Sequence, residues 1–157
     1  EHLVWPVLSL SSNYVYDDEL VVFTGGGNGP FYGLQMKQNA QESIFYVQAI
    51  LNHWLMELLV KSKASTFRGD YYSHGKQFIA TLPIYRIDYG NPSDVQKHDN
   101  IVEHVRTIMN LKNQANHARN ATEKTVFERS INAVNDELNT LIDALYQVEA
   151  QENGDEE

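Results

Sequence analysis

An almost unbroken apolar run from Ile44 to Val60 is the feature that most constrains how this chain folds. The polar residues within it are Gln48, Asn52, His53 and Glu57. A helix that is apolar on most faces is buried in a core, and a run with four polar groups and no basic flanks on both sides is not typical of a membrane crossing. We therefore expect one core helix here, opening near Asn39 or Gln41, with Glu42 in its first turn. An intrahelical pair of His53 with Glu57 is expected at its margin.

The segments before this run have the composition of β-strands. Residues 3–8 and 14–24 are rich in Val, Leu and aromatic side chains and show no helical period. Pro6 places the first strand at a sheet edge or at a strand start. Residues 31–36 resemble a return strand, forming a β-hairpin with the second strand through the turn GGGNGP at 25–30. A phosphate-binding loop is rejected there, because the Walker ending and the following helix are both missing.

The segment from Lys61 to Lys76 mixes basic and aromatic residues and is expected to be a loop. Phosphates are contacted by Lys and Arg, and base edges by Arg, Lys, Asn, Gln, Ser and Thr, so the composition suits nucleic acid. A solvated loop whose tyrosines cap the core explains the same composition equally well. The candidates for phosphate contact are Lys61, Lys63, Arg68 and Lys76, and those for base or sugar contact are Ser65, Thr66, Tyr71, Tyr72 and His74.

The remaining sequence indicates a change of architecture after a turn-rich linker, Arg86–Ser93. Before the linker, Phe78–Leu82 is expected to be a strand. We predict an α+β fold, with a small mixed or antiparallel sheet packed on the buried helix and followed by a two-helix antiparallel hairpin. The predicted domains are residues 1–92 for the α+β part, 93–150 for the helices and 151–157 for an acidic, disordered tail.

The last seventy residues have the pattern of two long helices. The first is expected to be capped by Ser93 or Asp94, and Asn120 with Glu123 forms a capping box for the second. A strict heptad then runs over three repeats, through Phe127, Ile131, Val134, Leu138, Leu141, Leu145 and Val148. The preceding helix is the expected partner of this seam, and another chain or domain is the competing one.

Charge and chemistry-bearing residues point away from an enzyme. The net charge is −9, but residues 121–157 hold ten acids and two bases, so the first 120 residues are almost neutral. No cysteine is present, which excludes disulfides, thiolate metal sites and a cysteine nucleophile. His98 and His104 diverge around their helix, although Asp99 and Glu103 share a face. We therefore expect no metal site, no catalytic residue and no enzymatic activity in this chain alone. Glu1 in place of Met indicates a processed chain or a fragment.

Three short motifs, in order, resemble the TaqI-like C-terminal specificity domain of adenine-N6 DNA methyltransferases from restriction–modification systems. The motifs are Ile50-Leu51-Asn52-His53 in the apolar helix, Leu82-Pro83-Ile84-Tyr85 after the basic loop, and Leu141-Ile142-Asp143-Ala144-Leu145-Tyr146-Gln147-Val148 at the close. The last lacks the glycine of the family pattern. The resemblance spans residues 14–148.

The resemblance implies a cytoplasmic recognition domain that reads double-stranded DNA for a methyltransferase domain or subunit. The Asn-Pro-Pro-Tyr-like catalytic motif and the glycine-rich S-adenosylmethionine site of such enzymes are absent here. No cofactor is therefore expected in this chain, and S-adenosylmethionine is expected in the methyltransferase part. The alternative is a protein-interaction module whose heptad helix forms a homodimer.

Overall fold

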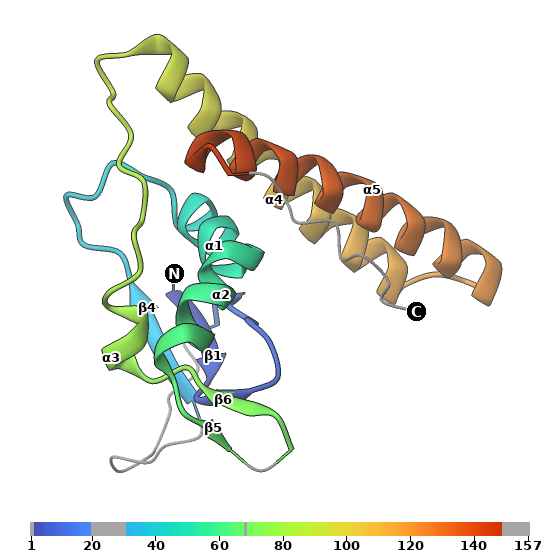
Figure 1. Cartoon of the computed structure of the whole chain (residues 1–157). Helices are drawn as coiled ribbons and strands as arrows, with labels where there is room; N and C mark the ends of the chain where they lie inside the picture. Colours follow the sequence, from blue (N-terminus) through green and yellow to red (C-terminus); the bar gives the residue numbers. More distant parts are fainter. Residues whose placement is uncertain (1, 20–30, 68, 149–157) are drawn as a thin grey trace, which may run out of the picture. The chain divides into compact units, whose positions relative to one another are not determined.

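The computed structural model describes residues 2–19, 31–67 and 69–148 (Figure 1). Contacts divide the chain into two compact units, Glu1–Arg86 and Ile87–Glu157. The first unit combines two small antiparallel sheets with three helices, and the second is a helical hairpin, within the described residues. The predicted α+β class with a C-terminal helical hairpin is confirmed. The contact boundary falls six residues before the one drawn from the sequence, and the expected acidic tail lies outside the described residues.

The first sheet is built around β1 (His2–Pro6), which lies between β3 (Val15–Asp17) and β4 (Phe31–Gln35). Both neighbours pair with β1 in antiparallel register, and Leu3 lies opposite Tyr16 on one side and Leu34 on the other. Within the described residues, the second strand does not pair with residues 31–36 as the expected hairpin requires, because β1 lies between β3 and β4. The second strand is described only to residue 19, and the expected turn at 25–30 lies outside the described residues.

β1 is central, so Pro6 does not mark an edge strand. Pro6 ends the strand, where its missing N–H removes no bond from the middle of the ladder. Along β1, Leu3 and Trp5 are buried, and they alternate with residues that face the other side of the sheet. The chain leaves the first sheet at Val7 and enters a second sheet through β2 (Leu8–Ser9). The strand expected over residues 3–8 is thus two short strands in different sheets.

The apolar run forms two helices and not one: α1 (Ile44–Asn52) and α2 (Trp54–Lys63). His53 separates them with extended backbone angles, φ −73° and ψ 144°. Its buried imidazole Nδ1 accepts from the backbone N–H of Leu55 at 3.4 Å and caps α2. His53 therefore lies between the two helices and not within one helix with Glu57, as the expected intrahelical pair required. α1 is capped by Ser43, later than the expected start, and Glu42 lies before the helix.

α1 is the centre of the core, as its composition predicts. Six of its nine residues are buried: Ile44, Tyr46, Val47, Ala49, Ile50 and Leu51. Its polar side chains reach the segment before β3, where Asn52 Oδ1 accepts from Tyr14 N at 2.9 Å. Gln48 and Asn52 both donate to the Tyr14 carbonyl oxygen. The polar residues of the run thus hold a neighbouring chain segment to the helix.

The basic segment is not a loop but mainly a hairpin of β5 (Thr66–Phe67) and β6 (Tyr71–Ser73). β6 is the middle strand of the second sheet, between β2 and β5. Gly69 (φ 83°) and Asp70 (φ 61°) take left-handed backbone angles in the connection, a conformation that Gly and Asp adopt more readily than most residues. Arg68 lies outside the described residues.

The strand expected over Phe78–Leu82 is wrong. Lys76–Ile79 forms a short helix, α3, followed by a turn. Gly75 precedes α3, and its carbonyl oxygen accepts from Phe78 N at 2.9 Å. The apolar residues Ile79 and Leu82 are three apart and both are buried, so a turn of helix carries them to one side.

The second unit consists of α4 (Pro92–Asn116) and α5 (Ala121–Tyr146), which pack against each other (Figure 1). Asn91 caps α4 two residues before the expected cap, and Pro92 occupies the first turn. The capping interaction of α5 is confirmed, since Asn120 Oδ1 accepts from Glu123 N at 2.8 Å. Among the described residues, no helix is long and apolar enough to span a membrane.

The heptad of α5 faces α4 most closely in its C-terminal half. Of the predicted seam residues, Leu138 and Leu145 are buried there, together with Ile142, which the predicted heptad did not include. The helix that packs on α5, α4, has a buried stripe that includes Ile101, Val102 and Val105. The other predicted seam residues, Phe127, Ile131, Val134 and Leu141, are partly exposed, and Val148 lies beyond the helix. α4 therefore supplies a partner for the seam within this chain.

Candidate nucleic-acid interface

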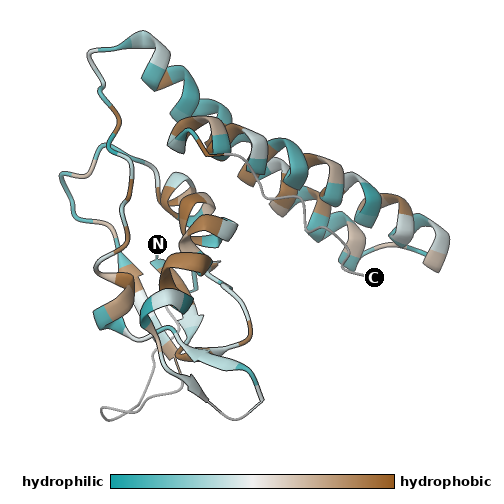
Figure 2. Ribbon diagram, viewed as in Figure 1, coloured by the Kyte–Doolittle hydropathy of each residue, from teal (hydrophilic) through white to brown (hydrophobic). Residues whose placement is uncertain are grey.

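The hairpin of β5 and β6, with the helix ends on either side, forms the candidate recognition segment, residues 61–76. Lys61 and Lys63 end α2 just before β5, and Lys76 begins α3 just after β6. Lys63 and Lys76 are exposed, whereas the Lys61 side chain is 36% exposed. Figure 2 shows the hairpin mostly in pale and teal shades, whereas α1 is mostly brown. The fold therefore places three candidate phosphate-binding lysines at the root of one hairpin.

The candidate base-contacting residues divide by exposure. Ser65 and Thr66 are exposed, and Tyr71 is 42% exposed. Tyr72 is half-buried, and the Lys61 Nζ atom lies 5.0 Å from its ring centroid in a cation–π contact. His74 is only 1% exposed, so its position does not support the predicted contact with bases or sugars.

His74 instead anchors the hairpin through its backbone and its ring. Its N–H donates to the Val7 carbonyl oxygen at 2.7 Å, and its carbonyl oxygen accepts from the Trp5 indole at 2.8 Å. The two ring nitrogens lie 2.9 Å from Glu57 Oε2 and 3.2 Å from the Tyr72 carbonyl oxygen. The ring therefore bridges the Glu57 side chain on α2 and the backbone of β6.

Glu57 is the centre of this polar cluster, which sequence reasoning missed. Its Oε2 atom also accepts from the Ser12 hydroxyl, and its Oε1 atom lies 3.3 Å from Lys61 Nζ. Burial by itself raises the pKa of Glu57. Hydrogen bonds from His74, Ser12 and Lys61, together with the charge of His74, outweigh the effect of burial and lower the pKa to about 2. Burial, and the charge of Glu57, raise the pKa of Tyr14. The sequence did contain one sign of this cluster, because a carboxylate within an apolar run requires polar partners when it is buried.

The cluster does not have the geometry of a nucleophilic triad. In a triad the serine bonds the histidine, and the acid orients that histidine. Here both the Ser12 hydroxyl and His74 bond the same oxygen of Glu57. No group of three or more potential metal ligands converges among the described residues. The arrangement therefore suits holding segments together and not activating a nucleophile.

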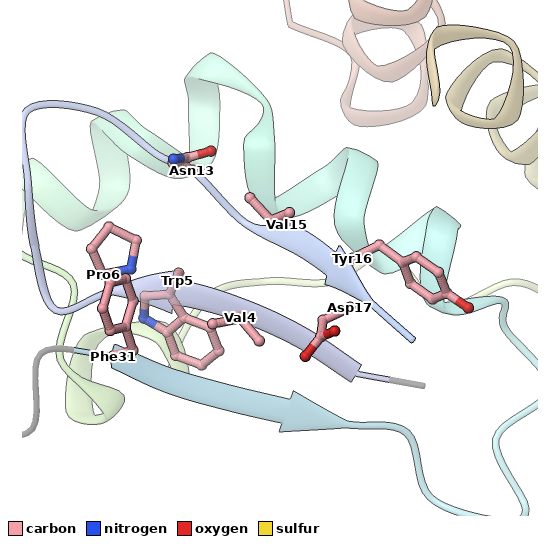
Figure 3. Close-up of a pocket in the computed structure, with 8 residues that line it drawn as sticks. All are labelled: Val4, Trp5, Pro6, Asn13, Val15, Tyr16, Asp17 and Phe31. Atoms are coloured by element: carbon pink, nitrogen blue, oxygen red, sulfur yellow. The ribbon is translucent and has the colours of Figure 1, made fainter. Parts of the chain in front are cut away.

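A second feature that the sequence did not reveal is an apolar groove on the first sheet, with a volume of about 520 Å³ (Figure 3). Val4, Pro6, Val15 and Phe31 line it from the three strands. Gly33 pairs with Val4 and contributes no side chain on this face. The carboxylate in the groove, Asp17, lies 3.1 Å from the His2 ring.

Two curated relatives connect the chain with restriction–modification enzymes. It is 25% identical over 148 residues, or 94% of its length, to the type II restriction enzyme and methyltransferase RM.Eco57I of Escherichia coli. It is 33% identical over 79 residues, or 50% of its length, to the type II methyltransferase M.HindII of Haemophilus influenzae. The chain spans only 15% of the length of each relative. No protein-family model matches it. The chain is therefore related to part of type II restriction–modification methyltransferases.

Proposed function

We propose that this chain is the DNA sequence-recognition domain of a restriction–modification or modification methyltransferase, of the TaqI-like C-terminal type. The observation that carries the proposal is the exposed hairpin with lysines at its root, in a chain that aligns over 94% of its length with a restriction–modification enzyme. The recognition segment contacts double-stranded DNA, and a methyltransferase region or subunit carries out the reaction.

Within this proposal the side chains of the recognition segment have two roles. Lys63 and Lys76 contact phosphates, with Lys61 beside them and Arg68 in the same segment. Thr66 and Tyr71 lie on the strands, where a two-stranded ribbon fits the width of the major groove, and Ser65 precedes them. Exposed hydroxyl and aromatic groups there read base edges and pack on sugars.

The proposal assigns no catalytic step to this chain. S-adenosylmethionine supplies the transferred methyl group, and we place its site in the methyltransferase region. The groove on the first sheet does not suit that cofactor, because its lining is mainly apolar and its Asp17 carboxylate is already paired with His2. The acidic helix α5 also repels DNA, so the affinity of the assembled enzyme depends on basic surfaces outside this chain.

The oligomerisation alternative is less favoured, because α4 already packs on the heptad of α5. A homodimer through these helices would need to use the partly exposed seam residues of the N-terminal half of α5.

The proposal is tested with the enzyme as it occurs, including its methyltransferase region or subunit. Lys63→Ala and Lys76→Ala should each weaken binding to duplex DNA and lower the slope of log affinity against log salt by about 1. Fluorescence anisotropy at several salt concentrations measures both quantities. Lys112→Ala, at an exposed position on α4, is the matched control. Unchanged affinity and slope in both hairpin variants would contradict the proposed interface.

A further inference from the structure

Glu57 joins the two ends of the recognition segment, although it lies outside it. The first strand of the hairpin, β5, follows α2 closely in the chain and begins three residues after Lys63. The second strand, β6, is followed by His74, whose ring lies 2.9 Å from Glu57 Oε2 on the same helix. β5 is thus joined to α2 by the chain itself, and β6 is joined to α2 by the contact of His74 with the Glu57 carboxylate.

The Glu57 carboxylate also contacts Lys61 and the segment that connects β2 and β3. Its Oε1 atom holds Lys61, whose ammonium lies over the ring of Tyr72 on β6. Its Oε2 atom accepts from Ser12, in the connection between β2 and β3. The Glu57 side chain is only 12% exposed, so it is too enclosed to be a surface contact for DNA. Its contacts therefore fix the orientation of the hairpin.

We propose that Glu57 is a positioning residue for sequence discrimination: it sets the pose in which the hairpin presents its exposed side chains to DNA. This inference rests on the proposed function of the recognition segment. Base contacts are directional, whereas attraction to phosphates is tolerant of orientation. Loss of the Glu57 contacts should therefore reduce discrimination between DNA sequences more than it reduces general DNA binding.

The variant Glu57→Gln distinguishes a positioning role from a simple effect of charge, because the two explanations predict different changes in DNA binding. The substitution removes a negative charge and releases Lys61, so charge alone predicts tighter binding to every duplex. Positioning predicts that the ratio of affinities for target and scrambled duplex falls by at least about tenfold, the effect expected for hydrogen bonds to a charged group. Binding to the scrambled duplex should stay equal or become tighter.

The experiment uses the enzyme with its methyltransferase region or subunit, after its target has been identified by mapping methylated sites in DNA. Competition binding then compares the target duplex with a scrambled duplex. Glu42→Gln is the matched control, because Glu42 is also a buried carboxylate, 2.7 Å from Arg86, and does not contact the hairpin. It should leave the affinity ratio unchanged.

The outcomes distinguish this inference from the proposed function. An unchanged ratio in a folded Glu57→Gln protein, or an equal loss in Glu42→Gln, would overturn the positioning role. If Lys63→Ala and Lys76→Ala also leave binding unchanged, the interface itself is wrong. Should Glu57→Gln fail to fold, Ser12→Ala removes one donor and keeps the His74 contact. It should lower the ratio about threefold, and no change would equally refute the role.

Discussion

The Glu57 cluster makes a quantitative prediction about how the stability of the first unit depends on pH. Its hydrogen bonds lower the pKa of Glu57 from 4.5 to about 2 in the folded chain. Each tenfold change in proton affinity corresponds to about 1.4 kcal/mol, so the charged carboxylate contributes at most about 3 kcal/mol to the free energy of unfolding. A depressed pKa stabilises the fold above the unfolded value, and this stabilisation is lost as the pH falls from about 5 to about 2.

Comparing the free energy of unfolding of the unmodified chain with that of Glu57→Gln separates the contribution of Glu57 from those of the other carboxylates. At pH 7 the variant should be less stable by up to about 3 kcal/mol, and the gap should close as the pH approaches 2. Urea titrations followed by tryptophan fluorescence measure the difference at each pH. Trp5 and Trp54, the two tryptophans of the chain, both lie in the first unit, so the signal reports that unit. A gap that stays constant between pH 7 and pH 2 would refute the electrostatic account of this cluster.

Two further predictions concern the helical unit and are measured by circular dichroism during urea unfolding. Leu138→Asp places a charge at a buried position of the seam and should cost at least about 3 kcal/mol, whereas Asn135→Asp at an exposed position should cost little. If light scattering instead shows a dimer that Leu138→Asp dissociates, the seam is shared between chains. Asn120→Ala removes the cap of α5 and should cost about 1 kcal/mol. Equal stability of Asn120→Ala and the exposed control Thr122→Ala would contradict the cap.

Local signals in the sequence were reliable where short-range physics determines the structure. The Asn120 cap and the heptad of α5 each depend on residues within one or two turns, and the structure has both the cap and the helical hairpin. The break at His53 is different, because a run that is apolar on most faces has no period that a break would interrupt. The order of strands around β1 depends on pairings between distant segments, which composition does not encode.

In the candidate site, too, features that depend on local sequence could be predicted, whereas those that depend on contacts between distant residues could not. The basic and aromatic composition of residues 61–76 was visible, and the structure gathers Lys61, Lys63 and Lys76 at one hairpin. The burial of His74 was not visible, since its partners Trp5, Val7 and Glu57 are all distant in sequence. A histidine among tyrosines and lysines has the composition of a surface contact, and only tertiary contacts show that it is an anchor.

This separation between anchor and surface has a consequence for how such a hairpin acquires specificity. At its root, the buried ring of His74 contacts Glu57 and the Tyr72 carbonyl oxygen, so a substitution there removes a partner of the enclosed Glu57 carboxylate, at a cost of about 1–3 kcal/mol. Farther along the strands, Thr66 and Tyr71 are exposed, and substitutions at such positions usually change stability by less than about 0.5 kcal/mol. The side chains assigned to DNA can therefore vary independently of those that hold the hairpin. Under the proposed function, a fixed root keeps the pose constant, so a change at Thr66 or Tyr71 would alter which base edge is read without altering where the hairpin lies.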